Sequence, residues 1–207
     1  MTYPDYWQQS QEFLSSVDPN LSKLFLEYPD YIISSRGEAL ETLLRSIVGQ
    51  QISVQAAASV WNKLANKIGQ IKPGNVLSIS FADLKACGLS KQKVQYITNI
   101  CNHFNSQSIN DHSYWEDRSF KSIYEELITI KGVGPWTAEM FGMFYLLEKD
   151  IFPINDIGII RAMNKIYGEE STLSIERIIE ISEQWKPYRS VACWFLWRSI
   201  DSEDVLY

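Results

Sequence analysis

Apolar residues recur at the helical period along most of this chain, and this pattern narrows the possible folds more than any other feature. Between Leu40 and Ile47 they fall at i, i+3, i+4 and i+7, and after a break at Gly49 a second stripe runs from Val54 to Ile68. Little of the sequence alternates at the strand period; residues 77–81 are a short exception. The sequence therefore predicts an all-α fold of about nine or ten helices.

Capping signals place several helix ends. Ser80 opens a capping box for a short helix that Gly88 ends, and Ser90 caps the helix that follows. Pro135 occupies a first helical turn, where proline is tolerated, and Pro187 begins the last helix. The remaining stripes predict a helix at 120–127, one from Pro135 through Leu147, one that Asn155 or Asp156 caps and that runs through Ile166, and one from Pro187 through Arg198.

Length and composition fit one compact domain or two interlocked subdomains. The chain has 207 residues, of which 45% are hydrophobic, so disorder and disulfide-stapled miniature folds are poor interpretations. No secretory signal and no apolar run of membrane-spanning length is recognisable. Three cysteines without CxxC spacing indicate reduced thiols, with no zinc or iron–sulfur centre. We therefore expect a cytoplasmic protein without a membrane partner.

The charge argues weakly against nucleic acid as a partner, because 19 Lys and Arg against 25 Asp and Glu leave a net charge of -6. Its distribution changes that interpretation. Two stretches carry only positive charges, with Lys85, Lys91 and Lys93 in residues 84–110 and Lys186, Arg189 and Arg198 in residues 186–198. The negative excess lies in residues 1–30 and in the tail, at Asp201, Glu203 and Asp204. We expect the basic stretches and Lys131 to face a polyanion, with a small phosphate footprint.

The segment Lys131-Gly132-Val133-Gly134-Pro135 separates two amphipathic helices. Two glycines one residue apart allow a tight hairpin, and they leave amide groups unpaired at the next helix N-terminus. Those amides can hold a phosphate oxygen without reading base sequence. The alternative is a simple helix–helix turn.

A carboxylate follows this hairpin at the start of another helix. Asp156, in Phe152-Pro153-Ile154-Asn155-Asp156, is either the N-cap of that helix or, if Asn155 is the cap, a free carboxylate in the first turn. A free carboxylate beside a cleft can stabilise positive charge or orient water.

Three segments in this order, LLRSIVGQQISVQAA, LITIKGVGPWTAEMF and FPINDIGIIRAM, resemble the helix-hairpin-helix (HhH-GPD) DNA glycosylase superfamily. The likeness is nearest to its alkylation-repair branch, the DNA-3-methyladenine glycosylase II enzymes, and the closing run WKPYRSVACWFLWRSI is similar to that branch's C-terminal helix. It covers roughly residues 18–200. The resemblance implies a single glycosylase domain over 1–207, with a cleft between a subdomain at about 38–150 and a second one made of about 1–37 and 151–207.

The resemblance assigns a catalytic and a DNA-binding role. It makes Asp156 the catalytic carboxylate, which stabilises an oxocarbenium-like sugar while water replaces a flipped-out base. It assigns DNA binding to the hairpin residues Gly132, Val133, Gly134 and Thr137. It also implies a structural monovalent cation, Na⁺ or K⁺, on the main-chain carbonyls of Ile128, Ile130 and Gly132, and no cofactor for catalysis.

The same resemblance outlines a base pocket and a wedge. Trp136 stands where bifunctional members carry a lysine nucleophile, so it implies hydrolysis without lyase activity, and its indole suits a cationic base. Trp197 matches a second pocket aromatic, and Met140 replaces a further one. Gln51 matches the residue that fills the gap left by the flipped base. Core packing for the tryptophans, and a linking role for Gln50 and Gln51, are the alternatives.

These features together predict a monofunctional enzyme that releases alkylated bases of the 3-methyladenine and 7-methylguanine type and leaves an abasic site. The expected partner is double-stranded DNA with damaged bases, bound by a monomer that is associated with the nucleoid in a bacterium. A catalytically silent helix-hairpin-helix DNA-binding module is the alternative from another class. A glycosylase for oxidised bases ranks lower, because its lysine nucleophile is missing here.

Overall fold

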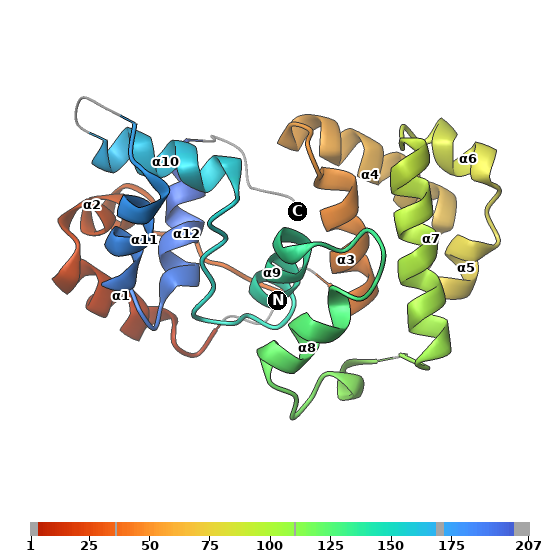
Figure 1. Cartoon of the computed structure of the whole chain (residues 1–207), viewed down its shortest axis with the longest axis horizontal. Coiled ribbons are helices and arrows are strands. Elements are labelled where there is room, and N and C mark those ends of the chain that lie inside the picture. Colours follow the sequence, from red (N-terminus) through yellow and green to blue (C-terminus); the bar gives the residue numbers. More distant parts are fainter. Residues whose placement is uncertain (1–3, 36, 110, 169–171, 201–207) are drawn as a thin grey trace. The chain divides into compact units, whose positions relative to one another are not determined.

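The computed structural model describes residues 4–35, 37–109, 111–168 and 172–200, and these residues form twelve α-helices, one 3₁₀ turn and no strand (Figure 1). The all-α prediction is confirmed. The expected number of helices was too low, because α5 (Pro73–Leu77) and the other short elements are too brief to show a helical period, and because α1 and α2 are separated by a single residue. The acidic tail residues Asp201, Glu203 and Asp204 lie outside the described residues.

The helices fall into two compact units. The discontinuous unit combines described residues 4–35 with 146–200, and the central unit contains 37–145. The units divide near residue 36 and at 145/146, whereas the sequence predicted subdomain boundaries at about 37/38 and 150/151. The discontinuous unit holds α1 (Trp7–Val17), α2 (Pro19–Glu27), α10 (Ile157–Tyr167), α11 (Ile175–Glu183) and α12 (Arg189–Arg198). The central unit holds α3 (Ala39–Gly49), α4 (Val54–Ile68), α5, α6 (Phe81–Ala86), α7 (Lys91–Ser106), η1 (His112–Tyr114), α8 (Phe120–Leu127) and α9 (Pro135–Phe144).

Local sequence signals explain most helix ends. The hydroxyls of Ser80 and Ser90 each accept a hydrogen bond from the amide three residues later, as an N-cap does. Gly88 follows α6 with a φ of +103°, a conformation that suits glycine. Two predicted ends were displaced. α9 stops at Phe144 rather than at 147, where Leu147 has a left-handed φ of 55°, and α12 begins at Arg189, two residues after Pro187.

The core of the discontinuous unit surrounds α12, whose residues 190–197 are all buried and which packs against α1, α2 and α10. A buried carboxylate ties this unit together across long sequence distances. Asp18 Oδ1 caps α2, and Oδ2 accepts hydrogen bonds from the Tyr167 hydroxyl (2.9 Å) and from Trp185 Nε1 (2.8 Å). A buried carboxylate with several donors is stable only when those donors are held in place, so Asp18 links α2 to α10 and to the end of α11.

The core of the central unit lies where α3 packs against α4, α7 and α9. A polar cluster on the α7 and α8 side centres on Glu126. Its Oε1 accepts from Tyr114 (2.9 Å) and contacts His103 Nε2 (2.8 Å), while Oε2 accepts from Arg118 (2.6 Å). Burial raises the pKa of Glu126, but the hydrogen bonds from His103, Arg118 and Tyr114 outweigh this and leave its pKa below the ordinary value.

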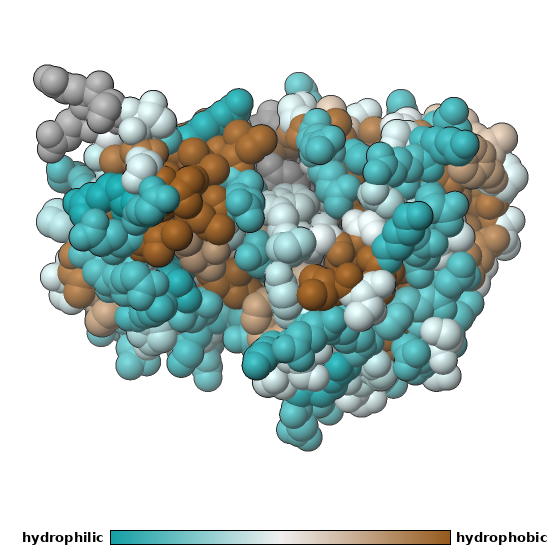
Figure 2. Space-filling view, in the orientation of Figure 1, coloured by the Kyte–Doolittle hydropathy of each residue, from teal (hydrophilic) through white to brown (hydrophobic). Residues whose placement is uncertain are grey.

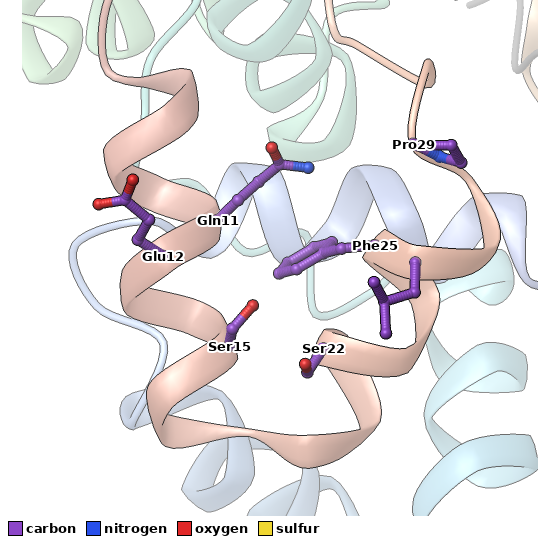
Figure 3. Close-up of a pocket in the computed structure, with 7 residues that line it drawn as sticks. Gln11, Glu12, Ser15, Ser22, Phe25 and Pro29 are labelled. Atoms are coloured by element: carbon purple, nitrogen blue, oxygen red, sulfur yellow. The ribbon is translucent and has the colours of Figure 1, made fainter.

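The surface carries few large apolar side chains. Figure 2 shows one group of them over the part of the discontinuous unit that holds α10 and α11, where Ile157, Ile175 and Ile179 are exposed. The others are Leu26, Ile52, Phe81 and Ile128. A groove of about 380 Å³ lies between α1 and α2, lined by Gln11, Glu12, Ser15, Ser22, Phe25, Leu26 and Pro29 (Figure 3). Among the described residues, no helix is both long and apolar enough to cross a bilayer.

Candidate active site

Asp156 is the N-cap of α10. Its Oδ1 accepts a hydrogen bond from the Ile159 amide at 2.8 Å, and the side chain is only 7% exposed. The possibility that Asn155 caps the helix and leaves Asp156 as a free carboxylate is therefore wrong. Instead, the backbone at the N-terminus of α10 fixes the position of the carboxylate, and the positive end of the helix dipole lies beside it.

Trp197 is the second group that holds Asp156. Its Nε1 donates to Asp156 Oδ1 at 2.9 Å from α12, and the indole is 2% exposed. Gly158 allows this approach: a Cβ at that position would lie 2.9 Å from both Trp197 Cδ1 and Asp156 Oδ1. The structure thus brings Asp156 and Trp197 together, with the indole as a hydrogen-bond donor to the carboxylate. Sequence reasoning did not single out Gly158.

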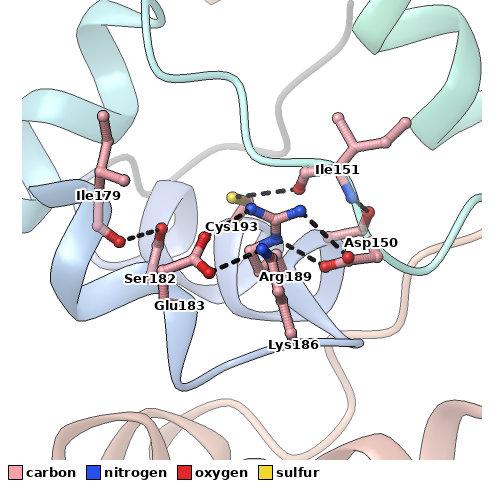
Figure 4. A network of polar contacts seen from close by, with 9 residues as sticks. Asp150, Ile151, Ile179, Ser182, Glu183, Lys186, Arg189 and Cys193 are labelled. Atoms are coloured by element: carbon pink, nitrogen blue, oxygen red, sulfur yellow. Dashed lines mark hydrogen bonds and ion pairs between the residues drawn. The ribbon is translucent and has the colours of Figure 1, made fainter.

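The segment that leads to Asp156 is tied to the start of α12. Arg189 binds Asp150 through two parallel hydrogen bonds of 2.6 and 3.0 Å, and the Ile151 amide donates to the Ser190 hydroxyl at 2.9 Å (Figure 4). Such a bidentate pair is a geometrically specific contact. This geometry corrects the expectation of a basic stretch at 186–198, because Arg189 pairs with Asp150 and Lys186 lies 2.7 Å from Glu183.

The hairpin between α8 and α9 forms a tight turn in the central unit. The Val133 amide donates to the Ile130 carbonyl at 2.9 Å, and Gly132 has a φ of +112°. A Cβ on Gly132 would lie 2.2 Å from the Tyr96 ring, so both the backbone conformation and the packing require glycine there. Asn99 donates to the Lys131 carbonyl at 2.9 Å and fixes the hairpin to α7.

The carbonyl groups expected to hold a monovalent cation lie on this hairpin. Ile128 is the C-cap of α8, where carbonyls lie beyond the helix's own hydrogen bonds. The Ile130 carbonyl accepts from Val133, and the Gly132 carbonyl accepts from Gln50 Nε2 at 3.5 Å. Each carbonyl oxygen has two lone pairs, and oxygen ligands suit hard cations, so these residues fit such an ion.

The loop between α3 and α4 lies beside the hairpin. Gln51 is exposed and has a left-handed φ of 58°, whereas Gln50 points inward and donates to Thr137 Oγ1 at 3.1 Å. Thr137 is 1% exposed, so its side chain supports the loop from inside the unit and its hydroxyl is absent from the surface. Of the two glutamines for which the sequence allowed a role in linking helices, Gln50 therefore has that role and Gln51 does not.

The other predicted pocket residues lie in the central unit. Trp136, in the first turn of α9, is partly exposed, and Met140, one turn later, is completely buried. The predicted residues therefore form two groups, each within one unit. Asp156 and Trp197 belong to the discontinuous unit, and the central unit carries Gln51, Ile128, Ile130, Gly132, Val133, Gly134, Trp136, Thr137 and Met140.

Two supporting residues were missed from the sequence, and a third was misinterpreted. Tyr96 and Asn99 lie on α7 and contact the hairpin, but their spacing in the sequence carries no signal of this. Lys93 was expected to face a polyanion, yet its Nζ donates to the Val48 and Gln50 carbonyls at 2.8 Å each. The Lys93 ammonium group therefore makes these contacts inside the central unit.

Comparison with known proteins identifies the family of this chain. Residues 44–187 match the HhH-GPD superfamily of base excision DNA repair proteins. The chain is 28% identical to the alkylbase DNA glycosidase-like protein mag2 of Schizosaccharomyces pombe, covering 93% of each chain. It is 29% identical to DNA-3-methyladenine glycosylase 1 of the same yeast, covering 90% of this chain and 84% of that one.

Two solved structures share the fold. The S. pombe 3-methyladenine DNA glycosylase Mag1 in complex with abasic DNA superposes with a TM-score of 0.85 at 27% identity, over 92% of this chain and 96% of that one. A DNA-3-methyladenine glycosidase from Bacillus halodurans gives 0.77 at 29% identity, over 96% and 92%. The resemblance drawn from the motifs is confirmed, and the chain belongs to the HhH-GPD superfamily of base excision DNA repair proteins.

Proposed function

We propose that this protein is a monofunctional DNA glycosylase that releases alkylated purines of the 3-methyladenine and 7-methylguanine type from duplex DNA and leaves an abasic site. The observation that carries the proposal is the buried Asp156 carboxylate, held by the Ile159 amide and the Trp197 indole in a member of a DNA repair superfamily. The names of its yeast relatives supply the lesion class.

The chemistry needs a fixed negative charge and water. As the bond between base and sugar breaks, the deoxyribose develops oxocarbenium character, and the Asp156 carboxylate stabilises that charge while water adds to the sugar carbon. The damaged base leaves with the bonding electron pair, and the water proton is lost to solvent. Position 136 is a tryptophan without a nucleophile, so no Schiff base forms there and the DNA strand stays intact.

Recognition of the lesion combines stacking, phosphate contacts and a wedge. Alkylation at N3 or N7 makes the purine cationic, and the partly exposed Trp136 indole attracts a cation through its face. The Gly132 and Gly134 amides of the hairpin bind DNA phosphate, while the Val133 amide closes the turn on the Ile130 carbonyl. A monovalent cation binds the carbonyls of Ile128, Ile130 and Gly132. Gln51 fills the gap in the duplex. The protein acts as a monomer at the cell's DNA, which in a bacterium is the nucleoid.

Asp156→Asn tests this proposal cleanly. Asn keeps an oxygen at the Oδ1 position, so the cap to Ile159 and the hydrogen bond from Trp197 both remain while the charge is lost. We expect the rate of 3-methyladenine release from methylated duplex DNA to fall by at least about 100-fold, with the circular dichroism spectrum and DNA affinity retained. Turnover at the wild-type rate by this variant would remove Asp156 from the catalytic role.

The same assay separates the two function classes. A silent DNA-binding module binds the methylated duplex but releases no base from it, even in the wild-type protein. A screen against duplexes with 3-methyladenine, 7-methylguanine, 1-methyladenine, 3-methylcytosine or hypoxanthine then defines the lesion range, for which the partly exposed Trp136 is the residue to test, because Met140 is completely buried.

A further inference from the structure

The loop that carries Gln51 is in a conformation that needs support. Gln51 has a backbone φ of 58°, which residues other than glycine seldom adopt. Such a conformation persists only when the surrounding structure fixes it. The loop's own main-chain hydrogen bonds are long: Gln50 N to Ile47 O and Ile52 N to Gly49 O each measure 3.4 Å. The backbone of the loop therefore holds this shape only weakly by itself.

Lys93 supplies a stronger contact from α7. Its Nζ donates to Val48 O and to Gln50 O, both at 2.8 Å, from 45 and 43 residues away in the chain. Both carbonyls lie at the end of α3, where the helix leaves its last acceptors without internal partners and where a cation interacts favourably with the helix dipole. Partial burial lowers the pKa of Lys93 from its ordinary value, as expected for an ammonium group that has exchanged water for carbonyl oxygens.

A second contact joins the same peptide to the hairpin. The Gln50 side chain donates to Thr137 Oγ1 at 3.1 Å and reaches the Gly132 carbonyl at 3.5 Å. The carbonyl that Lys93 holds belongs to Gln50, the residue directly before Gln51. Gln50 is therefore fixed at its main chain by α7 and at its side chain by α9, and Gln51 projects from a fixed point.

We propose that Lys93 is a positioning residue for duplex opening: its ammonium group locks the 50–53 loop so that Gln51 enters the gap left by the flipped base. This inference rests on the proposed function, since Gln51 has this task only in a base-flipping enzyme. Lys93 acts through Gln51, and its ammonium group makes no contact with DNA phosphate.

Lys91 offers a matched control. It lies two residues before Lys93 on the same helix and carries the same charge, but its side chain is exposed. Lys91→Met and Lys93→Met therefore remove equal charge from α7. Removing a lysine that contacts phosphate reduces the slope of log K for DNA binding against log salt concentration by about one unit. Removing a lysine that only supports a loop leaves this slope unchanged.

The experiment compares two forms of one lesion. Single-turnover base release is measured on a duplex with 7-methylguanine paired with cytosine, and on the same strand with 7-methylguanine in a one-nucleotide bulge. The bulged base has no partner to separate from, so its extrusion needs less help from a wedge. The ratio of the two rates does not depend on how much of the variant is folded, which keeps the test valid if Lys93→Met is unstable.

We expect Lys93→Met to lower the paired-to-bulged rate ratio by about tenfold or more, the factor that corresponds to losing a hydrogen bond from a charged donor. Lys91→Met should leave the ratio unchanged, whatever it does to affinity. In a Gln51→Ala background, Lys93→Met should lower the ratio no further, because both changes prevent residue 51 from filling the gap left by the flipped base. Lys93→Arg, which keeps the donors, should retain most of the ratio.

Three results overturn the inference: an unchanged ratio in Lys93→Met, an additive effect in the Gln51→Ala background, or a loss of about one unit of salt slope in Lys93→Met, as expected for a phosphate contact. Failure of the proposed function looks different, because the wild-type protein would then release no base from either substrate.

Discussion

Replacing Trp197 with Phe isolates what the indole N–H contributes to Asp156. The substitution removes the donor that lies 2.9 Å from Oδ1 and keeps an aromatic ring in a site that is 2% exposed in the native protein. A hydrogen bond to a charged group contributes about 1.5–3 kcal/mol. If the carboxylate needs this bond to face the sugar in the transition state, the single-turnover rate of base release should fall by about 10- to 150-fold.

Trp185 provides the matched control in the same unit. Its indole donates to a buried N-cap aspartate as well, Asp18 Oδ2 at 2.8 Å, but we assign Asp18 no part in the reaction. Each Trp→Phe change should reduce stability by about 2 kcal/mol and lower Tm by about 4–8 °C, as expected for a chain of this size. Only Trp197→Phe should slow base release by the factor given above.

Thermal unfolding and single-turnover assays on both variants provide the comparison. Equal losses of activity in the two variants, at matched fractions of folded protein, would show that Trp197 is a core residue like Trp185. An undiminished rate in Trp197→Phe would refute the argument that this hydrogen bond positions Asp156.

Three further outcomes are expected. Borohydride should trap no covalent adduct between protein and DNA, because Trp136 offers no amine; efficient trapping would reveal another nucleophile. Gly132→Ala should unfold at a lower temperature and bind DNA more weakly, since its Cβ meets the Tyr96 ring, while Gly134→Ala has nothing within 4 Å of its Cβ and should melt near the wild-type temperature. Glu126 has a lowered pKa in the folded protein, so its contribution to stability is present above pH 4.5 and is lost as the pH falls further. Urea unfolding of Glu126→Gln should accordingly show a weaker loss of stability on acidification, and equal pH dependence in both proteins would contradict this.

Helices were predictable from the sequence because their signals are local. A serine such as Ser90 caps whatever helix follows it, and an apolar stripe needs only its own neighbours to be recognised. The environment of Asp156 was less accessible, because the choice between a cap and a free carboxylate depends on Trp197, which lies 41 residues further along the chain. The resemblance identified the residue, and only the fold gives its hydrogen bonds.

Counting charges along the sequence was misleading for the same reason. Residues 186–198 carry three positive charges and no negative one, yet Arg189 pairs with Asp150 from 39 residues earlier. Lys93 belongs to another such stretch and binds carbonyl groups at the end of α3. A linear count therefore overestimates the charge available to DNA, and the exposed Lys91 and Lys131 are better candidates for phosphate contacts.

The discontinuous unit also constrains how the protein matures on the ribosome. Residues 37–145 emerge as one continuous segment and can fold while synthesis continues, as domains generally do. Asp18 gains its contacts with Tyr167 and Trp185, and Asp156 gains its contact with Trp197, only after those later residues have been made. A nascent chain, or one truncated before Trp197, can therefore have its hairpin formed while the Asp156 carboxylate still lacks the hydrogen bond from Trp197, and such a chain is not yet competent to cut a glycosidic bond.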